Sequence, residues 1–486
     1  MQQKSELPEG WAYSILDNIG KWSTGGTPSR KVVEYFGGDI PWVKSGDLND
    51  SIVTYTEEKI TKKGLDNSSA KLLPAGTVSV ALYGATIGKL GILNIDAATN
   101  QACANCQINP QMINPMFLFY YLLSQREELI KAGQGGAQPN LTNGIVRAWP
   151  ITLPPLAEQH RIVSAIEALF ARLDATNEKL DRVPGILKKF RQSVLAAACD
   201  GRLTEDWRKA NPDIESAKEL VKSIIHEKET KSEKRKVSLN SDLEESVVQN
   251  IPESWFESSL DKISIKITDG THHSPPNGAE GDFKYITAKN IKNDGIDLKN
   301  VTYVSSEVHD EIYSRCNPEY GDLLLIKDGA TTGIVTLNNL TEPFSMLSSV
   351  ALLKFPEGIS NKYIMYYMRS PDFQSNVQDK MGGAAITRLT LKKISNMIVA
   401  LPPLPEQHEI VRRVDALFAF ADSIESKVAA AREKTEKLRQ SILAKAFSGE
   451  LVETEAEIAR REGRDYEKAE VLIERIKKER RVGMGQ

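Results

Sequence analysis

The sequence predicts two copies of an α/β (α+β) domain, each followed by a long helix, with the two helices pairing as a coiled coil. Three observations predict this fold class: one motif occurs twice, a coiled-coil spacing of apolar residues follows each copy, and short β-rich segments precede it. At 486 residues the chain is also too long for a single core, so two to four domains are expected.

The repeated motif is Leu153-Pro-Pro-Leu-Ala-Glu-Gln-His160, which recurs as Leu401-Pro-Pro-Leu-Pro-Glu-Gln-His408, 248 positions later. Downstream of the motif the two copies continue to match at this offset without a gap. Upstream the offset drifts, and Pro8-Glu-Gly-Trp11 corresponds to Pro252-Glu-Ser-Trp255 at an offset of 244. Each copy therefore has a variable globular part and a strictly spaced part, and the long period indicates duplicated domains rather than a solenoid.

The strictly spaced part predicts a helix in both copies. Apolar or small residues follow one another in alternating steps of four and three, which is the seam of a coiled coil. The seam residues are Ile162, Ile166, Leu169, Leu173, Thr176, Leu180, Val183, Leu187, Phe190 and Val194 in the first copy, and Ile410, Val414, Leu417, Ala421, Ile424, Val428, Ala431, Thr435, Leu438 and Ile442 in the second. At 1.5 Å per residue each helix spans ~50 Å.

The two helices could instead pack separately, each on its own domain. Two ungapped seams with the same spacing favour pairing with each other. Pro184-Gly185 interrupts the first seam, and we expect it to kink or break that helix, because proline lacks the N–H of the helical hydrogen bond.

The globular parts are expected to be rich in strands. The predicted strands are 40–44, 78–82, 283–287 and 323–327, the second and fourth led by glycine turns at Gly76 and Gly321. Short helices are predicted over 117–124 and 363–370. A charged linker at 204–250 contains a helix-like stretch, 217–225, and the stretch 469–476 of the C-terminal tail resembles it.

Composition neither requires nor excludes a nucleic-acid partner. With 62 Lys and Arg against 65 Asp and Glu, the net charge is −3, so positive charge must be concentrated on one face or supplied by a partner. The polar N-terminus and an apolar run of only 116–123 predict neither a secretory signal nor a membrane span. Four cysteines without a framework of spacings suggest a reducing cytoplasm.

The motifs that resemble catalytic or metal sites are incomplete. Cys103-Ala-Asn-Cys106 lacks the second pair that a zinc site needs. The stretch 84–89 is one residue short of a phosphate-binding loop, and 317–320 has Glu where adenine methyltransferases carry the second proline of Asn-Pro-Pro-Tyr. Since nothing assembles a nucleophile, a base and an anion hole, the sequence predicts binding without catalysis.

A duplicated variable domain, each copy followed by Leu-Pro-Pro-Leu-x-Glu-Gln-His and a long helix, resembles the specificity subunits of Type I restriction–modification systems. Several further stretches are similar to that family, among them 25–29 with 39–42, 269–273, 286–291, 441–451 and, as in enteric members, 201–207. The resemblance covers nearly the whole chain.

The resemblance implies a domain order and a set of partners. It implies target-recognition domains at 1–152 and 251–400, conserved helical spacers at 153–203 and 401–486 that pair antiparallel, and a charged linker at 204–250. Each recognition domain would bind one half of a bipartite, asymmetric site in double-stranded DNA. Two methyltransferase subunits would dock on the helices, restriction and translocation subunits would join them, and S-adenosylmethionine, ATP and Mg²⁺ would be bound by these partners and not by this chain.

Candidate DNA contacts are polar residues in loops beside the family motifs, because such side chains can hydrogen-bond base edges or phosphates. They are Thr24, Thr27, Ser29, Arg30, Lys44, Ser45, Tyr83, Gln134 and Asn140 in the first domain, and Thr271, His272, His273, Lys289, Asn290, Lys327, Asp328, Thr332 and Arg388 in the second. For each of them a structural role in a turn is an equal alternative. Candidate subunit-docking residues are Glu158, Gln159, His160, Glu406, Gln407 and His408.

Two other functions remain open at this point. One is a stand-alone DNA adenine methyltransferase with its own specificity domains, against which the missing cofactor loop argues. The other is a coiled-coil scaffold with no role in DNA binding.

Overall fold

The computed structural model describes residues 7–133, 140–231, 251–381 and 388–483, and the chain divides into two compact units. Unit 1 comprises 1–181 together with 429–486, and unit 2 comprises 182–428. These units are not the linear stretches of the sequence, because the C-terminal residues belong to unit 1. The domain boundaries predicted from the repeat stay a prediction.

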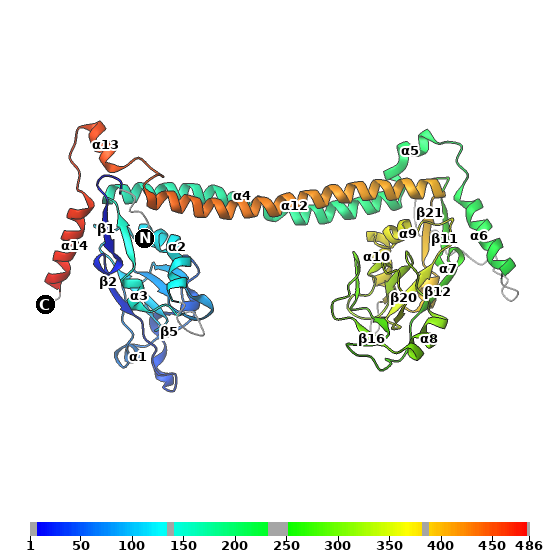
Figure 1. Ribbon diagram of the computed structural model, residues 1–486, viewed down its shortest axis with the longest axis horizontal. Helices are drawn as coiled ribbons and strands as arrows, with labels where there is room; N and C mark the ends of the chain where they lie inside the picture. The colour runs from blue at the N-terminus through cyan, green and yellow to red at the C-terminus, as the bar shows by residue number, and fades with distance from the viewer. Residues whose placement is uncertain (1–6, 134–139, 232–250, 382–387, 484–486) are drawn as a thin grey trace. The chain divides into compact units, whose positions relative to one another are not determined.

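Unit 1 is built on a five-stranded sheet in the order β2-β9-β6-β7-β4, with a three-stranded sheet β5-β3-β8 and a two-stranded sheet β1-β10 (Figure 1). Its strands are β1 (Ala12–Ile15), β2 (Lys21–Thr24), β3 (Phe36–Val43), β4 (Ser51–Val53), β5 (Lys59–Ile60), β6 (Val78–Ala81), β7 (Leu90–Leu93), β8 (Ala98–Thr99), β9 (Cys103–Gln107) and β10 (Pro150–Leu153). Its own helices are α1 (Lys62–Asp66), α2 (Pro115–Ala132), α3 (Asn143–Arg147), α13 (Glu455–Glu462) and α14 (Ala469–Gly483).

Unit 2 is built in the same way. A four-stranded sheet β12-β20-β17-β18 accompanies a three-stranded sheet β16-β13-β19 and the pairs β11-β21 and β14-β15. Its strands are β11 (Phe256–Ser259), β12 (Lys266–Asp269), β13 (Phe283–Ile286), β14 (Ile291–Lys292), β15 (Gly295–Ile296), β16 (Thr302–Val304), β17 (Leu323–Ile326), β18 (Val335–Leu337), β19 (Phe344–Met346), β20 (Val350–Lys354) and β21 (Ile398–Leu401). Its own helices are α5 (Glu205–Ala210), α6 (Ala217–Lys231), α7 (Leu260–Ile263), α8 (Ser306–Arg315), α9 (Asn361–Met368), α10 (Pro371–Met381) and α11 (Leu391–Ser395).

All four predicted strands are present, as β3, β6, β13 and β17, and each ends one residue earlier than predicted. Gly76 and Gly321 have φ of +87° and +86°, the left-handed conformation that favours glycine in the turn before each strand. The helix predicted over 117–124 is longer, because it is the middle of α2. Asn114 caps this helix by accepting from the amides of Met116 and Phe117, and Pro115 occupies its first turn.

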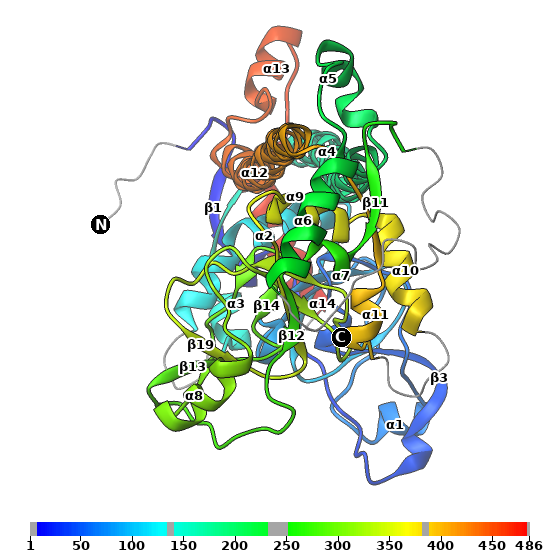
Figure 2. The ribbon, with the colours of Figure 1, turned by 90° about the vertical axis from the view of Figure 1, so that its right-hand side faces the viewer.

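Two long helices, α4 (Leu156–Cys199) and α12 (Leu404–Ser448), run through both units and pair antiparallel in each. In unit 1, Arg439 pairs with Asp174, and Arg432 lies 2.5 Å from Asp181. In unit 2, Arg191 lies 2.5 Å from Asp422 of α12. Figure 2 shows the two helices side by side, and the predicted coiled coil is confirmed.

Most of the predicted seam residues are buried or partly buried, and two are exposed, Thr176 and Leu438. The expectation that Pro184-Gly185 breaks the first helix is wrong, since α4 is a continuous helix with Pro184 inside it. Both residues lie on the exposed face of the helix. There water can hydrate the carbonyl group that loses its N–H partner to proline.

Each unit is completed by a segment that follows the end of a long helix, which we call its closing segment. The closing segment of unit 1 is 449–483, after α12, and that of unit 2 is 200–231, after α4. The amide of Ala469 donates to Gly10 O at 3.0 Å, and the amide of Ala217 donates to Ser254 O at the same distance. In Figure 1, α14 lies beside β1.

A glycine whose φ is +82° lies at or next to the start of each closing segment, Gly449 in unit 1 and Gly201 in unit 2. A Cβ on Gly449 would lie 2.3 Å from Pro8 Cγ, and a Cβ on Gly201 would lie 2.5 Å from Pro252 Cγ. Glycine is therefore required twice over, by backbone conformation and by close packing. The helix predicted over 469–476 is confirmed as part of α14, and that over 217–225 as part of α6.

In the described part of the chain, no helix combines the length and the apolar character that crossing a membrane requires.

Candidate functional site

In each unit, two strands that run in the same direction end at one edge of a sheet, on either side of a shared antiparallel strand. In unit 1, β2 and β6 both pair with β9. In unit 2, β12 and β17 both pair with β20. Most of the predicted DNA contacts follow the carboxyl ends of these strands, and we call this place the strand-end edge of each unit.

A second pair of backbone bonds at each edge confirms the likeness. Tyr83 forms a bridge with Asn140, and Asp328 forms one with Arg388. The adjoining amides of Leu141 and Leu389 donate to the carbonyl groups of Leu82 and Lys327, each at 2.8 Å. The edges thus share a backbone while the side chains on them differ.

In unit 1 the predicted contacts Arg30 and Lys44 converge on Glu58. Arg30 Nη1 lies 2.7 Å from Glu58 Oε2, and Lys44 Nζ lies 2.9 Å from Glu58 Oε1. The guanidinium of Arg30 also lies over Phe36 and Trp42, at 4.6 and 5.2 Å from the ring centroids, and remains 55% exposed. The hydrogen bonds from Arg30 and Lys44 lower the pKa of Glu58, so this carboxylate stays charged and fixes both cations.

The loop after β2 is pressed against the backbone beside it. A Cβ on Gly25 would lie 2.2 Å from Asn100 O, and one on Gly26 would lie 2.2 Å from the amide of Ala70. Trp42 Nε1 donates to Gly26 O at 3.0 Å, and Thr27 donates to Gln101. Thr24, Ser29 and Tyr83 are exposed, Ser45 is half-buried, and Gln134 lies outside the described residues.

In unit 2 the predicted contacts divide into exposed and buried ones. Those with an exposed or partly exposed side chain are Thr271, His272, His273, Lys289, Asp328, Thr332 and Arg388. Lys327 is 1% exposed and Asn290 is 5% exposed. Asn290 closes a turn, since its Oδ1 accepts from the Thr287 amide at 3.0 Å and its Nδ2 donates to Asp297 O at 3.1 Å.

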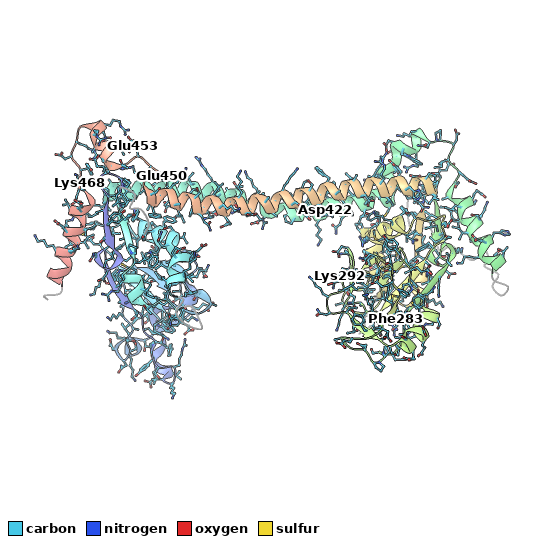
Figure 3. The ribbon with its side chains drawn as sticks, in the orientation of Figure 1. Phe283, Lys292, Asp422, Glu450, Glu453 and Lys468 are labelled. Atoms are coloured by element: carbon cyan, nitrogen blue, oxygen red, sulfur yellow. The ribbon has the colours of Figure 1, made fainter. Side chains whose placement is uncertain are left out.

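The loop after β12 repeats the close packing of its counterpart in unit 1. A Cβ on Gly270 would lie 1.8 Å from Met346 O, so only glycine fits there. The next residue, Thr271, donates its amide to the same carbonyl at 2.9 Å. Elsewhere in this unit the ring of Phe283 stacks on His309 with centroids 3.7 Å apart; Phe283 is labelled in Figure 3.

Of the predicted docking residues, Glu158 and Gln159 are fully buried at the start of α4. Trp11 Nε1 and the amide of Glu455 donate to Glu158, both at 2.8 Å. Gln159 accepts from the Asn114 amide at 3.0 Å. Burial raises the pKa of Glu158, and these hydrogen bonds oppose that shift.

Glu406 and Gln407 occupy the same place at the start of α12, and they are also fully buried. Glu406 accepts from Trp255 Nε1 at 2.9 Å, from Thr204 Oγ1 at 2.7 Å and from Arg208 Nη1 at 2.5 Å. Gln407 accepts from the Ser360 amide at 2.8 Å. Within each unit, the buried Glu and Gln therefore connect the globular part to the long helix, and the Glu also connects both to the closing segment. Of the six predicted docking residues, only His160 and His408 are exposed.

The closing segments carry residues that the sequence prediction missed. In unit 1, Glu455 lies 2.6 Å from Arg161 and 2.6 Å from Arg464. Burial raises its pKa, but the two arginines outweigh burial and lower it. Glu450 and Glu453, labelled in Figure 3, lie between α12 and α13. The repeated Pro-Glu-x-Trp motif was the available signal, because its Trp11 and Trp255 are the donors to Glu158 and Glu406.

The four cysteines are free and buried. Cys103 and Cys106 lie on β9, and burial raises the pKa of the Cys103 thiol to about 12. Within the described ranges, no group of three or more His, Cys, Asp or Glu side chains could hold a metal ion.

Comparison with known proteins agrees with this architecture. The family model described as "Type I restriction modification DNA specificity domain" matches twice, over 8–184 and 252–431. The Type I restriction enzyme EcoDI specificity subunit of Escherichia coli is 30% identical over 495 residues, covering 99% of this chain and 97% of that protein.

Two solved structures share the fold. A chain from work on complex assembly and conformational transition of the type I R-M system has a TM-score of 0.60 at 19% identity, covering 92% of this chain and all of that one. The HsdS subunit from Thermoanaerobacter tengcongensis has a TM-score of 0.54 at 18% identity, covering 92% and 99%. The chain therefore belongs to the family of Type I restriction–modification specificity subunits, with two copies of the DNA specificity domain in one polypeptide.

Proposed function

We propose that each unit of this specificity subunit binds one half of a bipartite, asymmetric DNA site through its strand-end edge. The observation that carries this proposal is the repeated edge, on which one backbone arrangement presents different side chains. Unit 1 presents Thr24, Tyr83 and Asn140, whereas unit 2 has the buried Asp269 in place of Thr24 and presents Asp328 and Arg388. Since base edges are distinguished by side-chain donors and acceptors, the two half-sites should differ in sequence.

Within unit 1, we assign the strongest contact to Arg30. Its guanidinium is half exposed, and Glu58 and two aromatic rings hold it, so little side-chain freedom is lost when it binds DNA. Lys44 shares the same carboxylate and adds positive charge beside it. In unit 2, Lys327 and Asn290 act as internal supports, and the exposed residues of the edge make the contacts.

The partners are two methyltransferase subunits that dock along α4 and α12, with restriction and translocation subunits joining them. A groove of 1130 Å³ in unit 1 supports docking there: Phe119, Phe170 and Phe447 line it, together with acidic residues such as Glu167 and Glu436. Because Glu158, Gln159, Glu406 and Gln407 are buried, their part in docking is to hold the helix starts, and His160 and His408 supply exposed surface.

S-adenosylmethionine, ATP and Mg²⁺ belong to these partner subunits. The free cysteines and the DNA target support a cytoplasmic location.

A genome-wide map of methyladenine, made with and without this chain, tests the proposal. A gapped, two-part motif should disappear when the chain is deleted. Exchange of residues 1–150 for those of another family member should change one half of the motif and leave the other half intact. A continuous short motif, or a change in both halves, would contradict it.

Two further measurements separate this function from the alternatives. A stand-alone methyltransferase would bind S-adenosylmethionine as the purified chain, whereas a specificity subunit should not. A scaffold without a DNA role would show no salt-sensitive binding to the two-part duplex in complex with its methyltransferase partner.

A further inference from the structure

The strand-end edge of unit 2 contains a buried group of charges. Lys327, which directly follows β17, has a side chain that is only 2% exposed. Its Nζ lies 3.4 Å from Asp269 Oδ2 and 3.1 Å from Asp328 Oδ2. The Asp269 side chain is itself 3% exposed. Removing an ammonium group from water is costly unless carboxylates surround it, so these three groups fix one another's positions.

Each carboxylate of this group also contacts an exposed arginine. Arg388 Nε lies 3.1 Å from Asp328 Oδ1, and its side chain is 52% exposed. Arg315 Nη2 lies 3.0 Å from Asp269 Oδ1 and donates to the Asp269 carbonyl at 3.0 Å and to the Gly270 carbonyl, so this nitrogen is fully engaged within the protein, although the side chain is 51% exposed. Buried Lys327 is thereby linked through two carboxylates to two guanidinium groups on the surface.

The contact between Asp328 and Arg388 leaves part of the hydrogen-bonding capacity of both side chains unused. Asp328 Oδ1 is buried and has no partner in good hydrogen-bond geometry among the described residues, although Arg388 Nε is close to it. Arg388 approaches Asp328 through Nε, and its two terminal nitrogens make no hydrogen bond or ion pair with the described residues, so they remain available as a fork. A small rotation of the guanidinium would complete the bond to Asp328 and aim this fork.

Unit 1 shows that the fold does not need this charge network. The equivalence follows from the backbone: Thr24 and Asp269 end matching strands, and the carbonyls of Leu82 and Lys327 accept matching amides. Where unit 2 has Asp269, Lys327, Asp328 and Arg388, unit 1 has Thr24, Leu82, Tyr83 and Asn140. A buried ion group that one copy of a domain lacks is better explained by what that copy binds than by folding.

We propose that Lys327 is a positioning residue that holds Arg388, through Asp328, as a preoriented fork for paired acceptor atoms on DNA, while Asp269 balances the charge of Lys327 and anchors Arg315. These acceptors are O6 and N7 of a guanine in the major groove, or two oxygens of a phosphate. The proposal rests on the proposed function, because it assumes that this edge contacts one half-site. Preorganisation by a buried support is what a bidentate contact requires, since misalignment of either nitrogen loses the pair.

The experiment uses the full chain in complex with its methyltransferase partner, bound to duplex carrying the methylated motif. Lys327→Met removes the buried charge, and Asp269→Thr combined with Lys327→Leu installs the residues of unit 1 while keeping the charges balanced. Leu82→Met, at the equivalent position of unit 1, is the matched control. Thermal unfolding of each complex identifies variants that fold normally.

We expect both unit 2 variants to weaken binding at least tenfold and to blur the half-site of unit 2, with the other half-site unchanged. Leu82→Met should leave binding and motif unchanged. Arg388→Ala and Arg388→Lys distinguish the acceptors. A guanine contact predicts that both variants relax one base position, whereas a phosphate contact predicts uniform weakening by Ala, a salt dependence lower by about one charge, and tolerance of Lys.

The results separate this inference from the function beneath it. If the charge-balanced double variant folds, binds and methylates like the wild type while Arg388→Ala changes the motif, the positioning role is wrong and the half-site assignment stands. If Arg388→Ala is silent while domain exchange still alters one half-site, the arginine fork is wrong. If domain exchange alters nothing, the proposed function itself fails.

Discussion

The carboxylate of Glu406 should hold the closing segment of unit 2 in place, and Glu406→Gln tests this directly. The carboxylate is fully buried and accepts from Trp255, Thr204 and Arg208. An amide in its place turns one acceptor atom into a donor, so a buried N–H is left facing another N–H. It also removes the charge that compensates Arg208, whose side chain is 18% exposed.

The expected cost follows from these contacts. Losing a hydrogen bond to a charged group costs about 1.5–3 kcal/mol, and an unsatisfied buried donor adds about 1–3 kcal/mol. A total of about 2.5–6 kcal/mol corresponds to a rise in local opening of about two to four orders of magnitude, at 1.4 kcal/mol per tenfold change. The opening should be confined to the closing segment, because Glu406 ties this segment to the helix.

Hydrogen exchange of the full chain, followed by mass spectrometry, measures this opening peptide by peptide. Peptides from 200–210 should exchange faster in Glu406→Gln, while those from 449–462 should not change. The matched variant Glu158→Gln should show the opposite pattern with a smaller effect, because Glu158 accepts from Trp11 and a backbone amide and not from an arginine. A change below threefold in 200–210, or equal changes in both segments, would refute the reasoning.

Three other predictions concern the stability of the chain. Pro184→Ala should raise the melting temperature, because proline in a helix interior costs ~3 kcal/mol relative to alanine and Pro184 is exposed; an unchanged or lower value would mean that the helix needs this residue. Gly270→Ala should destabilise unit 2 by about 1–3 kcal/mol or more in urea unfolding, because the added Cβ would collide with Met346 O. Gly278→Ala is the neutral control, since the nearest atom to its Cβ would be 3.8 Å away. Equal effects of the two variants would contradict the packing argument. Arg412 and Arg413 lower the pKa of Glu409 to about 2, so the ionised carboxylate contributes stability above the unfolded pKa near 4.5, and this stability is lost as the pH falls toward 2. Glu409→Gln should therefore make the melting temperature depend less on pH between 4.5 and 2. Parallel curves for the wild type and the variant would show that the ion pairs of Glu409 contribute nothing.

The strands and the long helices could be predicted because their signals are local. Apolar runs after glycine turns gave β6 and β17, and the four-three spacing gave α4 and α12. Errors arose where solvent or a cap decided the outcome. Pro184 was expected to interrupt its helix because proline removes a hydrogen bond, but its exposed position lets water replace that bond. The extent of α2 was underestimated because the cap at Asn114 was overlooked.

The sequence located the polar loops of the candidate site, and the DNA contacts themselves stay a prediction. The polar loops after β2, β6, β12 and β17 do gather at one edge in each unit. A sequence does not distinguish an exposed lysine from a buried one, so Lys327 and Lys44 received the same expectation although only Lys44 reaches the surface. Glu158 and Glu406 were assigned to docking because the repeat singles them out. That assignment stays a prediction, and their hydrogen bonds give both residues a role in the internal structure of each unit.

The division of unit 1 between the two ends of the polypeptide has a consequence for how the protein is made. Its core includes Leu472 and Ile476, which a ribosome adds only after all of unit 2 has been synthesised. The unit encoded first is therefore expected to be finished last, while the later one can assemble from a continuous stretch during translation. Premature termination after residue 448 would then leave unit 2 and its half-site recognition intact. It would abolish recognition by unit 1, although most of unit 1 is encoded far upstream of the stop codon.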